Sequence, residues 1–383
     1  MKKFRVGVAG TGFIGPVHVE ALRRLGFIEV LGIVDIDEAS AKEKSRAMFI
    51  PKHYANYTEM LADSEIDSVH ICTPNDLHYD MIKEALAAGK HIICEKPLTL
   101  TSAEAREVAA LAKEKDLACA LQFNLRFYPL LHEMKNMVQS GELGEIFSVG
   151  GSYLQDWLFF QTDYNWRLKS PIPNSARAVA DIGSHWMDSV EFVTGLQIDS
   201  LCADFATFHP VRKKPLKPIE TYAGKMLSPA DYEDVPIDTE DYASMLLRFN
   251  SGARGAFTVS QVAAGRKNRM YIEVFGSKAG MAFDSESPNI LWIGRRDGRN
   301  EQLIRDPSLV SPFAGNLIAT PGGHNEGYAD TAKQLFKKFY GYIADGDFGK
   351  TPPFPTFDDG LRGLILCEKI VQSAKSESWV KVL

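Results

Sequence analysis

Three glycines near the start of the chain, Gly10, Gly12 and Gly15, constrain the fold more than any other feature of the sequence. They fit the pattern G-x-G-x-x-G, which follows the apolar run Phe4–Ala9 and precedes the helix-like segment Val17–Leu25. In a strand–turn–helix unit the first glycine permits a tight turn, the second lets a pyrophosphate approach the backbone, and the third allows the helix to pack closely on the strand. The pattern therefore predicts a dinucleotide-binding loop with the phosphates at the helix N-terminus. The loop residues expected to contact the cofactor are Gly10, Thr11, Gly12, Phe13, Ile14 and Gly15.

Residues 4–121 alternate between two periodicities. Strand-length apolar runs occur at Phe4–Ala9, Val30–Val34, Ser68–Cys72, His91–Cys94 and Leu117–Leu121. The helical segments between them are Val17–Leu25, Glu38–Met48, Tyr57–Ala62, Tyr79–Ala88 and Ala103–Lys115. Strands that alternate with helices form a parallel sheet, and continuous apolar strands indicate that both faces of the sheet are covered. We therefore expect an α/β Rossmann dinucleotide-binding domain over residues 1–122.

The pattern changes after residue 122. A helix-like segment, Pro129–Ser140, leads into longer strand-like runs, and two helical segments, Gly327–Ala344 and Asp358–Ala374, come late in the chain. The strand-like runs are Ile146–Leu154, Leu201–Phe208, Tyr242–Phe249, Arg254–Val262, Met270–Phe275 and Ile290–Ile293. The turn signal Asn-Ser-Gly at 250–252 joins consecutive strands, which is typical of antiparallel pairing. We expect residues 123–383 to form an α+β domain with a large, mostly antiparallel sheet, and the proline-rich segment His209–Pro236 to be a long surface loop.

The composition is that of an ordinary globular protein. Of the 383 residues 45% are hydrophobic and 24% are charged, with a net charge of -6. The absence of a Lys/Arg block argues against nucleic-acid binding, and the absence of an apolar run of about 18 residues argues against a membrane-spanning helix. Glycines interrupt the apolar stretch at the N-terminus, so we expect no signal peptide. The five cysteines, Cys72, Cys94, Cys119, Cys202 and Cys367, form no CxxC pair, which predicts reduced thiols in a cytoplasmic protein and no metal site.

Asp35 ends the second apolar run, twenty residues after Gly15. A carboxylate at this position accepts hydrogen bonds from the ribose hydroxyls and repels a 2′-phosphate. The next residue is Ile36, which offers a phosphate no partner. The pair therefore favours NAD over NADP. Asp37 is the better candidate for the N-cap of the helix that begins at Glu38.

Polar residues follow two further strand-like runs. They are Thr73, Pro74, Asn75 and His78 after one run, and Glu95, Lys96 and Pro97 after the next. Ligands of an open α/β sheet bind at the carboxyl ends of its strands, so both groups are expected on the cofactor side. Lys96 is expected at the nicotinamide end, and the peptide between Lys96 and Pro97 is a candidate for the cis form because an X–Pro bond lowers its cost.

Asp181 and His185 form the candidate catalytic pair of the second domain. They are four positions apart in the sequence, so in a helix both project from one face. A histidine titrates near neutral pH and suits the transfer of a proton to or from an alcohol oxygen, while Asp181 can orient the substrate or stabilise charge. The spacing alone leaves open a capping aspartate with a hydrogen-bonded histidine at a domain interface.

These motifs combine with further residues along the chain. The combination consists of Ala9–Gly15, Thr73-Pro74-Asn75 with His78, Glu95-Lys96-Pro97, Asn124 with Arg126, Trp166-Arg167, Asp181 with His185, and Gly265-Arg266-Lys267-Asn268. With it the chain resembles the glucose–fructose oxidoreductase and inositol dehydrogenase family over nearly its whole length. The resemblance implies a Rossmann domain followed by an α+β domain that binds substrate and forms a homodimer or homotetramer through its open sheet. We expect that sheet to expose alternating apolar residues, such as those of Arg254–Val262.

The resemblance also implies roles for single residues. It implies Lys96, Asp181 and His185 as the catalytic group, and it implies that Asn124, Trp166 and Arg167 contact the cofactor. Polar and aromatic segments supply the remaining candidates, since aromatic faces stack on sugar rings and amides bind hydroxyls. The expected substrate-binding residues are Lys96, Arg126, Tyr153, Gln155, Trp157, Asp181, His185 and His324.

The leading hypothesis is an NAD-dependent oxidoreductase. Hydride would pass between nicotinamide and a secondary alcohol of a sugar, glycoside, anhydrosugar or inositol-like cyclitol. One alternative is an NADPH-dependent reductase of a keto-sugar or anhydro-sugar, and another is a non-catalytic dinucleotide-binding regulator, which the presence of Lys96 and His185 disfavours. The sequence leaves open the substrate, the oxidised carbon, the direction, the choice of base between Lys96 and His185, and dimer versus tetramer.

Overall fold

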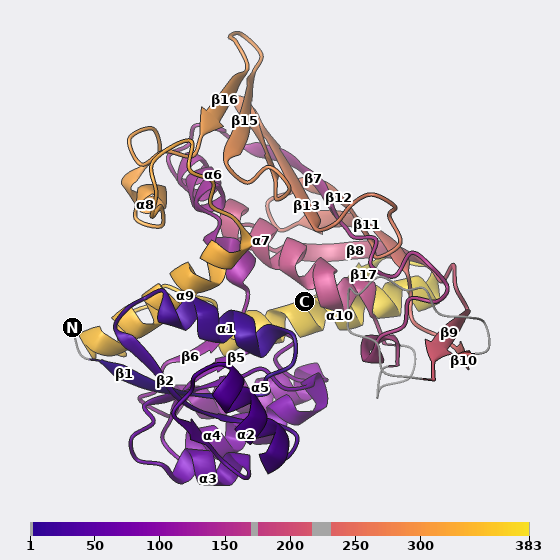
Figure 1. Ribbon diagram of the computed structural model, residues 1–383. Coiled ribbons are helices and arrows are strands. Elements are labelled where there is room, and N and C mark those ends of the chain that lie inside the picture. Colours follow the sequence, from indigo (N-terminus) through magenta and orange to yellow (C-terminus); the bar gives the residue numbers. More distant parts are fainter. Residues whose placement is uncertain (1–2, 170–174, 217–230, 383) are drawn as a thin grey trace. The chain divides into compact units, whose positions relative to one another are not determined.

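The computed structural model describes residues 3–169, 175–216 and 231–382 (Figure 1). The chain divides into two compact units. The first unit comprises Met1–Phe127 and Tyr328–Leu364, and the second comprises Tyr128–Gly327 and Ile365–Leu383. The late segment Tyr328–Leu364 thus returns to the N-terminal part of the chain, a return that no sequence pattern indicated.

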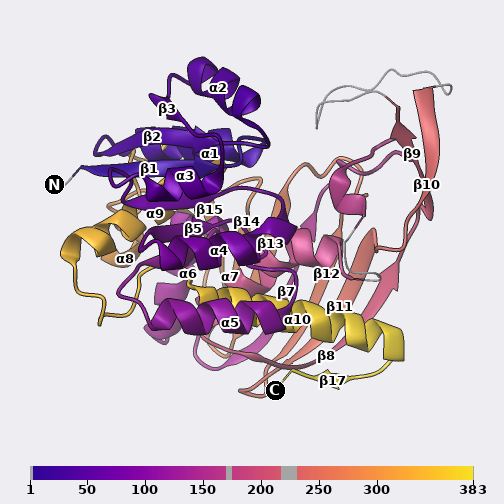
Figure 2. The same cartoon turned by 90° about the horizontal axis from the view of Figure 1, so that it is seen from below.

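A six-stranded parallel sheet forms the centre of the first unit. Its order is β3-β2-β1-β4-β5-β6, with β1 (Phe4–Ala9), β2 (Ile28–Val34), β3 (Lys52–His53), β4 (Ser68–Ile71), β5 (His91–Cys94) and β6 (Cys119–Leu121). The helices are α1 (Ile14–Arg23), α2 (Glu38–Ala47), α3 (Tyr57–Ala62), α4 (His78–Ala87), α5 (Ser102–Lys113) and α9 (Tyr328–Asp345). Helices α3, α4 and α5 pack in a row (Figure 2), and α1 packs against α9. The predicted Rossmann domain is confirmed, with the strand order reversing between β1 and β4.

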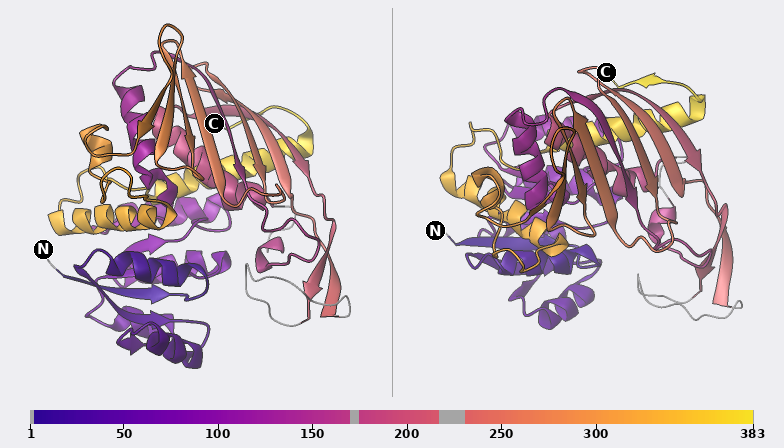
Figure 3. Two further views of the ribbon diagram at one scale, coloured as in Figure 1. Left: turned by 45° about the horizontal axis from the view of Figure 1, so that its top comes forward. Right: turned by 90° about the horizontal axis from the view of Figure 1, so that it is seen from above.

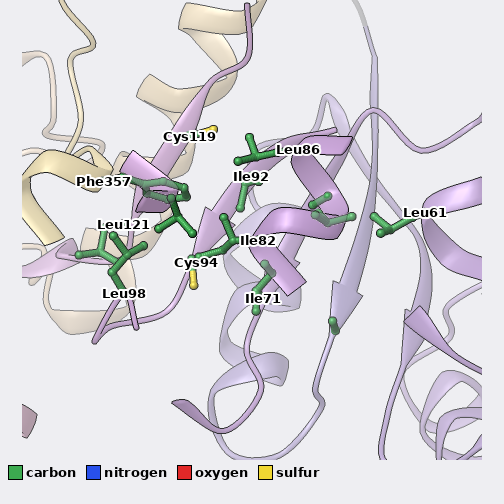
Figure 4. Close-up of a cluster of buried hydrophobic side chains, with 14 of the residues drawn as sticks. Leu61, Ile71, Ile82, Leu86, Ile92, Cys94, Leu98, Cys119, Leu121 and Phe357 are labelled. Atoms are coloured by element: carbon green, nitrogen blue, oxygen red, sulfur yellow. The ribbon is translucent and has the colours of Figure 1, made fainter. Parts of the chain in front are cut away.

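Apolar side chains on both faces of the strands hold the helices to this sheet. On the side of α4, Ile71 of β4 and Ile92 of β5 lie close to Ile82 and Leu86 of the helix (Figure 4). The C-terminal helix α10 (Phe357–Ser376) begins in the same cluster, where Phe357 lies beside Leu121 of β6. Each of these five side chains in the sheet and α4 is at most 3% exposed. Burial on this scale stabilises by roughly 1.5–3 kcal/mol for each large apolar side chain.

A nine-stranded sheet forms the centre of the second unit (Figure 3). Its order is β16-β15-β14-β13-β7-β12-β11-β8-β17, and all neighbours are antiparallel except β7 and β12. The strands are β7 (Ile146–Leu154), β8 (Ile198–Ala206), β11 (Tyr242–Phe249), β12 (Arg254–Ser260), β13 (Arg269–Gly276), β14 (Ala279–Asp284), β15 (Ile290–Arg295), β16 (Glu301–Ile304) and β17 (Val380–Lys381). The helices of this unit besides α10 are α6 (Pro129–Gln139), α7 (Ser184–Thr194) and α8 (Pro312–Gly315). The mostly antiparallel sheet expected from the sequence is confirmed.

The two faces of the large sheet carry different residues. One face is covered by α7, whose Trp186 stacks on Phe257 of β12 with 4.2 Å between ring centroids. The opposite face holds residues such as Ala256 of β12 and Leu246 of β11. The expectation that Arg254–Val262 exposes its apolar residues is wrong for the largest two, because Phe257 and Val259 both point to the covered face and are buried.

The segment His209–Pro236 is not simply a loop. Its described ends form a small antiparallel sheet, β9 (Val211–Pro215) with β10 (Tyr232–Pro236), and residues 217–230 lie outside the described residues. Cross-strand ion pairs support the pairing, at 2.5 Å between Lys213 and Asp234 and 2.6 Å between Lys214 and Glu233. The prediction failed because charged pairs rather than alternating apolar residues mark these two strands. Among the described residues, no helix combines the length and apolar character that crossing a membrane requires.

Candidate functional site

The glycine loop between β1 and α1 has the geometry that its sequence predicts. Gly10 has a φ of +85°, and a Cβ there would lie 2.7 Å from the carbonyl oxygen of Cys72. A Cβ on Gly15 would collide with the carbonyl oxygen of Gly10, while a Cβ on Gly12 would meet nothing within 4 Å. Gly10 and Gly15 are therefore required by the fold, and Gly12 leaves open space beside the backbone. This cradle, at the N-terminus of α1, fits the pyrophosphate of a dinucleotide.

Asp35 lies at the end of β2 next to this loop. Its carboxylate accepts hydrogen bonds from the backbone N–H of Thr11 at 2.9 Å, from the Thr11 hydroxyl, and from the backbone N–H of Ile36 at 2.8 Å. Lys44 of α2 contacts it at 3.0 Å. Burial alone would raise the pKa of Asp35, but these donors outweigh burial and the pKa is lowered. The carboxylate is therefore ionised and ready to accept from ribose hydroxyls; Lys44 was not anticipated from the sequence.

Exposed apolar side chains flank the same region. Ile36 is 90% exposed and Phe13 is 62% exposed. These two exposed side chains offer an apolar surface to an adenine ring. The surroundings of Asp35 and the glycine loop thus fit the adenosine half of the cofactor.

The polar residues after β4 and β5 are tied together by His78. Its ring is buried, with Nδ1 at 2.8 Å from the Pro97 carbonyl oxygen and Nε2 at 3.1 Å from the Thr73 carbonyl oxygen. Burial lowers the pKa of His78. The predicted cis peptide between Lys96 and Pro97 is present. His78 therefore connects the turn at Thr73 with the turn at Pro97. Thr73, Asn75 and Lys96 are partly exposed, and Pro74 is exposed.

Glu95 faces inward and begins a buried hydrogen-bonded chain. Its carboxylate lies 3.0 Å from His18 Nε2 on α1, and His18 Nδ1 lies 2.8 Å from His70 Nδ1 on β4. His70 Nε2 lies 2.9 Å from the hydroxyl of Tyr340 on α9, which in turn lies 2.8 Å from Ser68. Two neutral imidazoles can make all of these hydrogen bonds if Tyr340 donates to His70, His70 to His18, and His18 to the Glu95 carboxylate. Glu95 is thus held by the fold, directly beneath Lys96, whose backbone N–H it accepts at 3.2 Å.

Three members of this chain, His18, His70 and Tyr340, were not expected from the sequence. A histidine three residues after Gly15, on the helix that opens at the glycine loop, was the one visible signal. Its partner His70 is 52 residues away, and a separation of that size gives no pattern in a single sequence.

Two predicted site residues follow β6 in the turn Asn124–Phe127. Asn124 is buried and donates to the Thr331 hydroxyl at 2.7 Å. Arg126 pairs with Asp359 at 2.6 Å, and although burial alone would raise the pKa of that carboxyl, the Arg126 charge helps to lower it. Both side chains are therefore fixed by residues of the returning segment.

The second unit holds Asp181 and His185 on consecutive helical turns, with one predicted substrate residue, Tyr153, near His185. Asp181 lies in a π-helical turn, Val179–Gly183, that runs directly into α7, and His185 is the second residue of α7. Such π turns are rare and frequently occur at functional sites. The expected helix is thus present, but the turn that carries Asp181 is π-helical and not α-helical. His185 is buried, and its ring lies 6.5 Å from that of Tyr153 on β7.

Asn268 connects the polar-aromatic residues near His185. Its Oδ1 accepts from the Tyr153 hydroxyl and from Gln155 Nε2, both at 2.8 Å. Gln155 Oε1 in turn accepts from the Trp157 indole at 2.9 Å. Tyr153, Gln155 and Trp157 are thus joined into one hydrogen-bonded group, which can present hydroxyls, amides and ring faces to a polyhydroxylated molecule.

The remaining candidates are placed less centrally. Arg167 lies 3.7 Å from Asp181, within the short turn Trp166–Leu168, and the side chain of Trp166 lies outside the described part of the structure. His324 is exposed, and its backbone carbonyl accepts from Arg305. In the described ranges, no group of three or more His, Cys, Asp or Glu side chains is arranged to hold a metal ion.

Comparison with known proteins identifies the family. Residues 4–123 match an oxidoreductase family with an NAD-binding Rossmann fold, and residues 131–282 match the GFO/IDH/MocA C-terminal domain. The chain belongs to the GFO/IDH/MocA family. The resemblance, the fold and the NAD cofactor expected from the sequence are confirmed, and this GFO/IDH/MocA oxidoreductase has relatives named as sugar and polyol dehydrogenases.

Two relatives of this GFO/IDH/MocA protein match over almost their full lengths. Levoglucosan dehydrogenase of Pseudarthrobacter phenanthrenivorans is 29% identical, with 100% of this chain and 99% of the relative covered. Myo-inositol 2-dehydrogenase of Thermotoga maritima is 26% identical, with 99% and 98% covered. The solved structure of levoglucosan dehydrogenase in complex with NADH and L-sorbose has a TM-score of 0.88 at 28% identity, with 100% of both chains covered. Its complex with NADH and levoglucosan has a TM-score of 0.87 at 27% identity, with 99% of both covered.

Proposed function

We propose that this protein is an NAD-dependent dehydrogenase that acts on a secondary alcohol of a sugar, glycoside, anhydrosugar or cyclitol. The observation that carries the proposal is on the second unit, where the His185 ring lies 6.5 Å from that of Tyr153, a member of the hydrogen-bonded set Tyr153, Gln155 and Trp157. A proton-transferring imidazole beside amides, a phenol and an indole suits a ring with several hydroxyls. Relatives named for levoglucosan and myo-inositol support the same substrate class.

The cofactor would be held by residues of the first unit. The glycine loop would receive the pyrophosphate, Asp35 the adenosine ribose, and Ile36 the adenine ring, while Lys96 and the turn at Thr73 would lie toward nicotinamide. When bound, NAD supplies the acceptor for the hydride of the alcohol carbon. The chain itself has to remove the hydroxyl proton and stabilise the negative charge that develops on oxygen.

We assign these two tasks to different residues. His185 takes the hydroxyl proton, because an imidazole nitrogen can act as a general base toward an alcohol. Lys96 stabilises the developing alkoxide by its positive charge. Asp181 orients the substrate or His185. In the reverse assignment Lys96 is the base, and the pH profiles of Lys96 and His185 variants distinguish the two assignments.

A substrate panel tests the function directly. The purified protein is incubated with NAD and a set of sugars, glycosides, anhydrosugars and cyclitols, and NADH absorbance is followed. We expect turnover on at least one member, which is lost in Lys96→Ala. Higher kcat/KM for NADPH with keto-sugars would favour the reductase instead, and tight NADH binding without turnover on any compound in either direction would favour a regulator.

We also propose that the free face of the large sheet is the interface of a homodimer or homotetramer. Leu246 is 54% exposed although its strand lies well inside the sheet. Its partner on the neighbouring strand β12 is Ala256, and the partner of Ala256 on β7 is Gly150, so the residues beside Leu246 on this face are small. Phe275, on the same face of β13, is 38% exposed. An open apolar and small-residue surface on a central sheet is typical of association sites.

A further inference from the structure

Asp181 is held from within its own unit by Gln261. Gln261 follows β12, and its Nε2 donates to Asp181 Oδ2 at 2.8 Å. Its backbone is fixed as well, since its N–H donates to the Asp241 carbonyl at 3.1 Å and its carbonyl accepts from Leu158 at 3.2 Å. Gln261 is completely buried, so water does not compete for its amide. The donor is therefore held rigidly against one oxygen of the candidate catalytic carboxylate.

The orientation of this amide is set by charge on its other side. Gln261 Oε1 accepts from Arg177 Nη1 at 3.2 Å. A cation thus lies on the oxygen side and an anion on the nitrogen side, so rotation of the amide by half a turn would place like partial charges together at both ends. The side chain consequently transmits the position of Arg177 to Asp181.

Arg177 is itself locked by two adjacent carboxylates. Asp241 pairs with its guanidinium and also accepts from Arg212 at 2.7 Å. The two carboxylate oxygens of Glu240 accept from the backbone N–H of Arg177, at 2.9 and 2.8 Å. One of these oxygens also accepts from the backbone N–H of Val179, at 2.9 Å. These contacts fix the start of the π-helical turn that carries Asp181. All four charged residues are at most 4% exposed.

We propose that Gln261 is a positioning residue for Asp181 and sets its charge state and rotamer through the Arg177–Asp241 pair. The proposal rests on the proposed function, in which Asp181 acts on the substrate. A hydrogen bond donated to a carboxylate favours its ionised form, and a buried donor does so more strongly than an exposed one. Gln261 reaches the chemistry through Asp181 alone.

Two substitutions of Gln261 separate donation from packing. Gln261→Met keeps the length of the side chain and removes the donor, and we expect kcat/KM to fall about 10- to 100-fold through misplacement of Asp181. In Gln261→Glu the protonated acid copies the amide, because its carbonyl oxygen can accept from Arg177 while its O–H donates to Asp181. Loss of that proton places two carboxylates in contact.

The pH profile is therefore the decisive readout. The charged groups that face residue 261 are Arg177 and Asp181. Arg177 in turn pairs with Asp241, which also pairs with Arg212, and Asp181 lies 3.7 Å from Arg167. We expect kcat/KM of Gln261→Glu to approach that of the unmodified protein at low pH and to fall along a new limb as pH rises. Gln261→Met should show no such limb. The matched control is Gln372→Glu, at an exposed position of α10, which should change neither kcat/KM nor the profile.

Kinetics of Asp181 and Gln261 variants, singly and combined, distinguish failure of the proposed function from failure of the positioning proposal. If Asp181→Asn keeps normal turnover, the proposed function is wrong about Asp181; if Asp181→Asn is impaired and Gln261→Met keeps more than half of its kcat/KM, only the positioning proposal is overturned. Parallel losses of Gln261→Met and Gln261→Glu at every pH also overturn it. The double-mutant cycle of Asp181→Asn and Gln261→Met measured by thermal midpoint needs no substrate, and simple additivity of the two variants there contradicts the contact.

Discussion

At the level of single residues, Asp35 has more partners than a ribose-binding carboxylate needs. Lys44 contacts it at 3.0 Å, so a cation lies beside the carboxylate that we expect to bind the ribose. Replacing Asp35 with Ser and Ile36 with Arg removes the repelling charge, frees Lys44 and adds a second phosphate partner. We expect the ratio of kcat/KM for NADP over NAD to rise about 30- to 900-fold, since two charge contacts of about 1–2 kcal/mol each are gained or unmasked.

Lys44 also supplies the control for this prediction. Lys44→Met in the double variant should remove part of the gain with NADP and leave the activity with NAD nearly unchanged. A higher kcat/KM with NADP than with NAD in the unmodified protein would contradict the argument from Asp35.

The division of labour between Lys96 and His185 predicts different kinetic signatures. Lys96→Ala should leave NAD affinity nearly intact, because the glycine loop and Asp35 remain, and should lower kcat by about 10²–10³-fold. His185→Ala should lower kcat by about 10²–10⁴-fold and abolish the pH limb near neutrality. Asp181→Asn should change kcat and KM together. The measurement is kcat/KM against pH for each variant, with NADH affinity determined by fluorescence; near-normal turnover of His185→Ala with its limb intact would make Lys96 the base.

The positions of several candidate cofactor residues in the fold could be predicted because their motifs are local. The glycine loop, Asp35 and the Glu95–Lys96 turn each follow a recognisable strand, and the strand fixes where they lie. The supporting residues could not be predicted. Lys44 reaches back from the next helix, and Gln261 lies 80 residues from Asp181. Contacts over such separations depend on how the chain folds back, which no local pattern records.

At the level of elements, several apolar strands were predicted with their observed bounds, whereas β14 (Ala279–Asp284) was not predicted although its apolar residues are buried. The bounds expected for Phe4–Ala9, Ile146–Leu154 and Tyr242–Phe249 coincide with β1, β7 and β11. Elements whose stability comes from polar contacts were missed. Strands β9 and β10 pair through charged side chains, and the π-helical turn at Asp181 depends on Glu240 and Arg177 rather than on its own apolar spacing.

The buried chain across β4, α1 and α9 predicts a pH dependence of stability. Burial, with the neighbouring His18, lowers the pKa of His70 well below its ordinary value. The folded protein therefore keeps His70 neutral, while the unfolded chain binds a proton below a pH of about 6.5. This contribution to stability is complete above that pH and is lost as pH falls, by up to about 1.4 kcal/mol per pH unit.

His70→Leu tests this contribution. At pH 7.5 we expect the variant to be less stable by about 1–3 kcal/mol, since Tyr340 and His18 lose a buried partner. The difference should shrink as pH falls from 7.5 to 5.0, because the variant has no histidine to protonate on unfolding. Thermal midpoints of both proteins over this range provide the measurement, and a difference that stays constant with pH would show that His70 does not titrate on unfolding.

At the level of the whole molecule, the free face of the nine-stranded sheet has the composition of an interface. A row across it runs through Trp292, Ala282, Glu273, Gly150, Ala256, Leu246 and Cys202. Helix α7 covers the opposite face, so this row is the one that a second copy of the chain can reach. Small residues near its centre allow close approach, and Leu246 supplies an exposed apolar contact.

Leu246→Glu should therefore separate the subunits. In a two-fold arrangement the same substitution enters the interface from both copies, so each new carboxylate is buried beside apolar surface and near its symmetry mate. We expect the unmodified protein to sediment as a dimer or tetramer at micromolar concentration and the variant to sediment as a monomer with unchanged NADH binding. Leu309→Glu, at a leucine that is 58% exposed outside the sheet, is the matched control and should sediment like the unmodified protein. A monomeric unmodified protein would remove the assembly proposal, and a Leu246→Glu variant that remains oligomeric would move the interface to another surface.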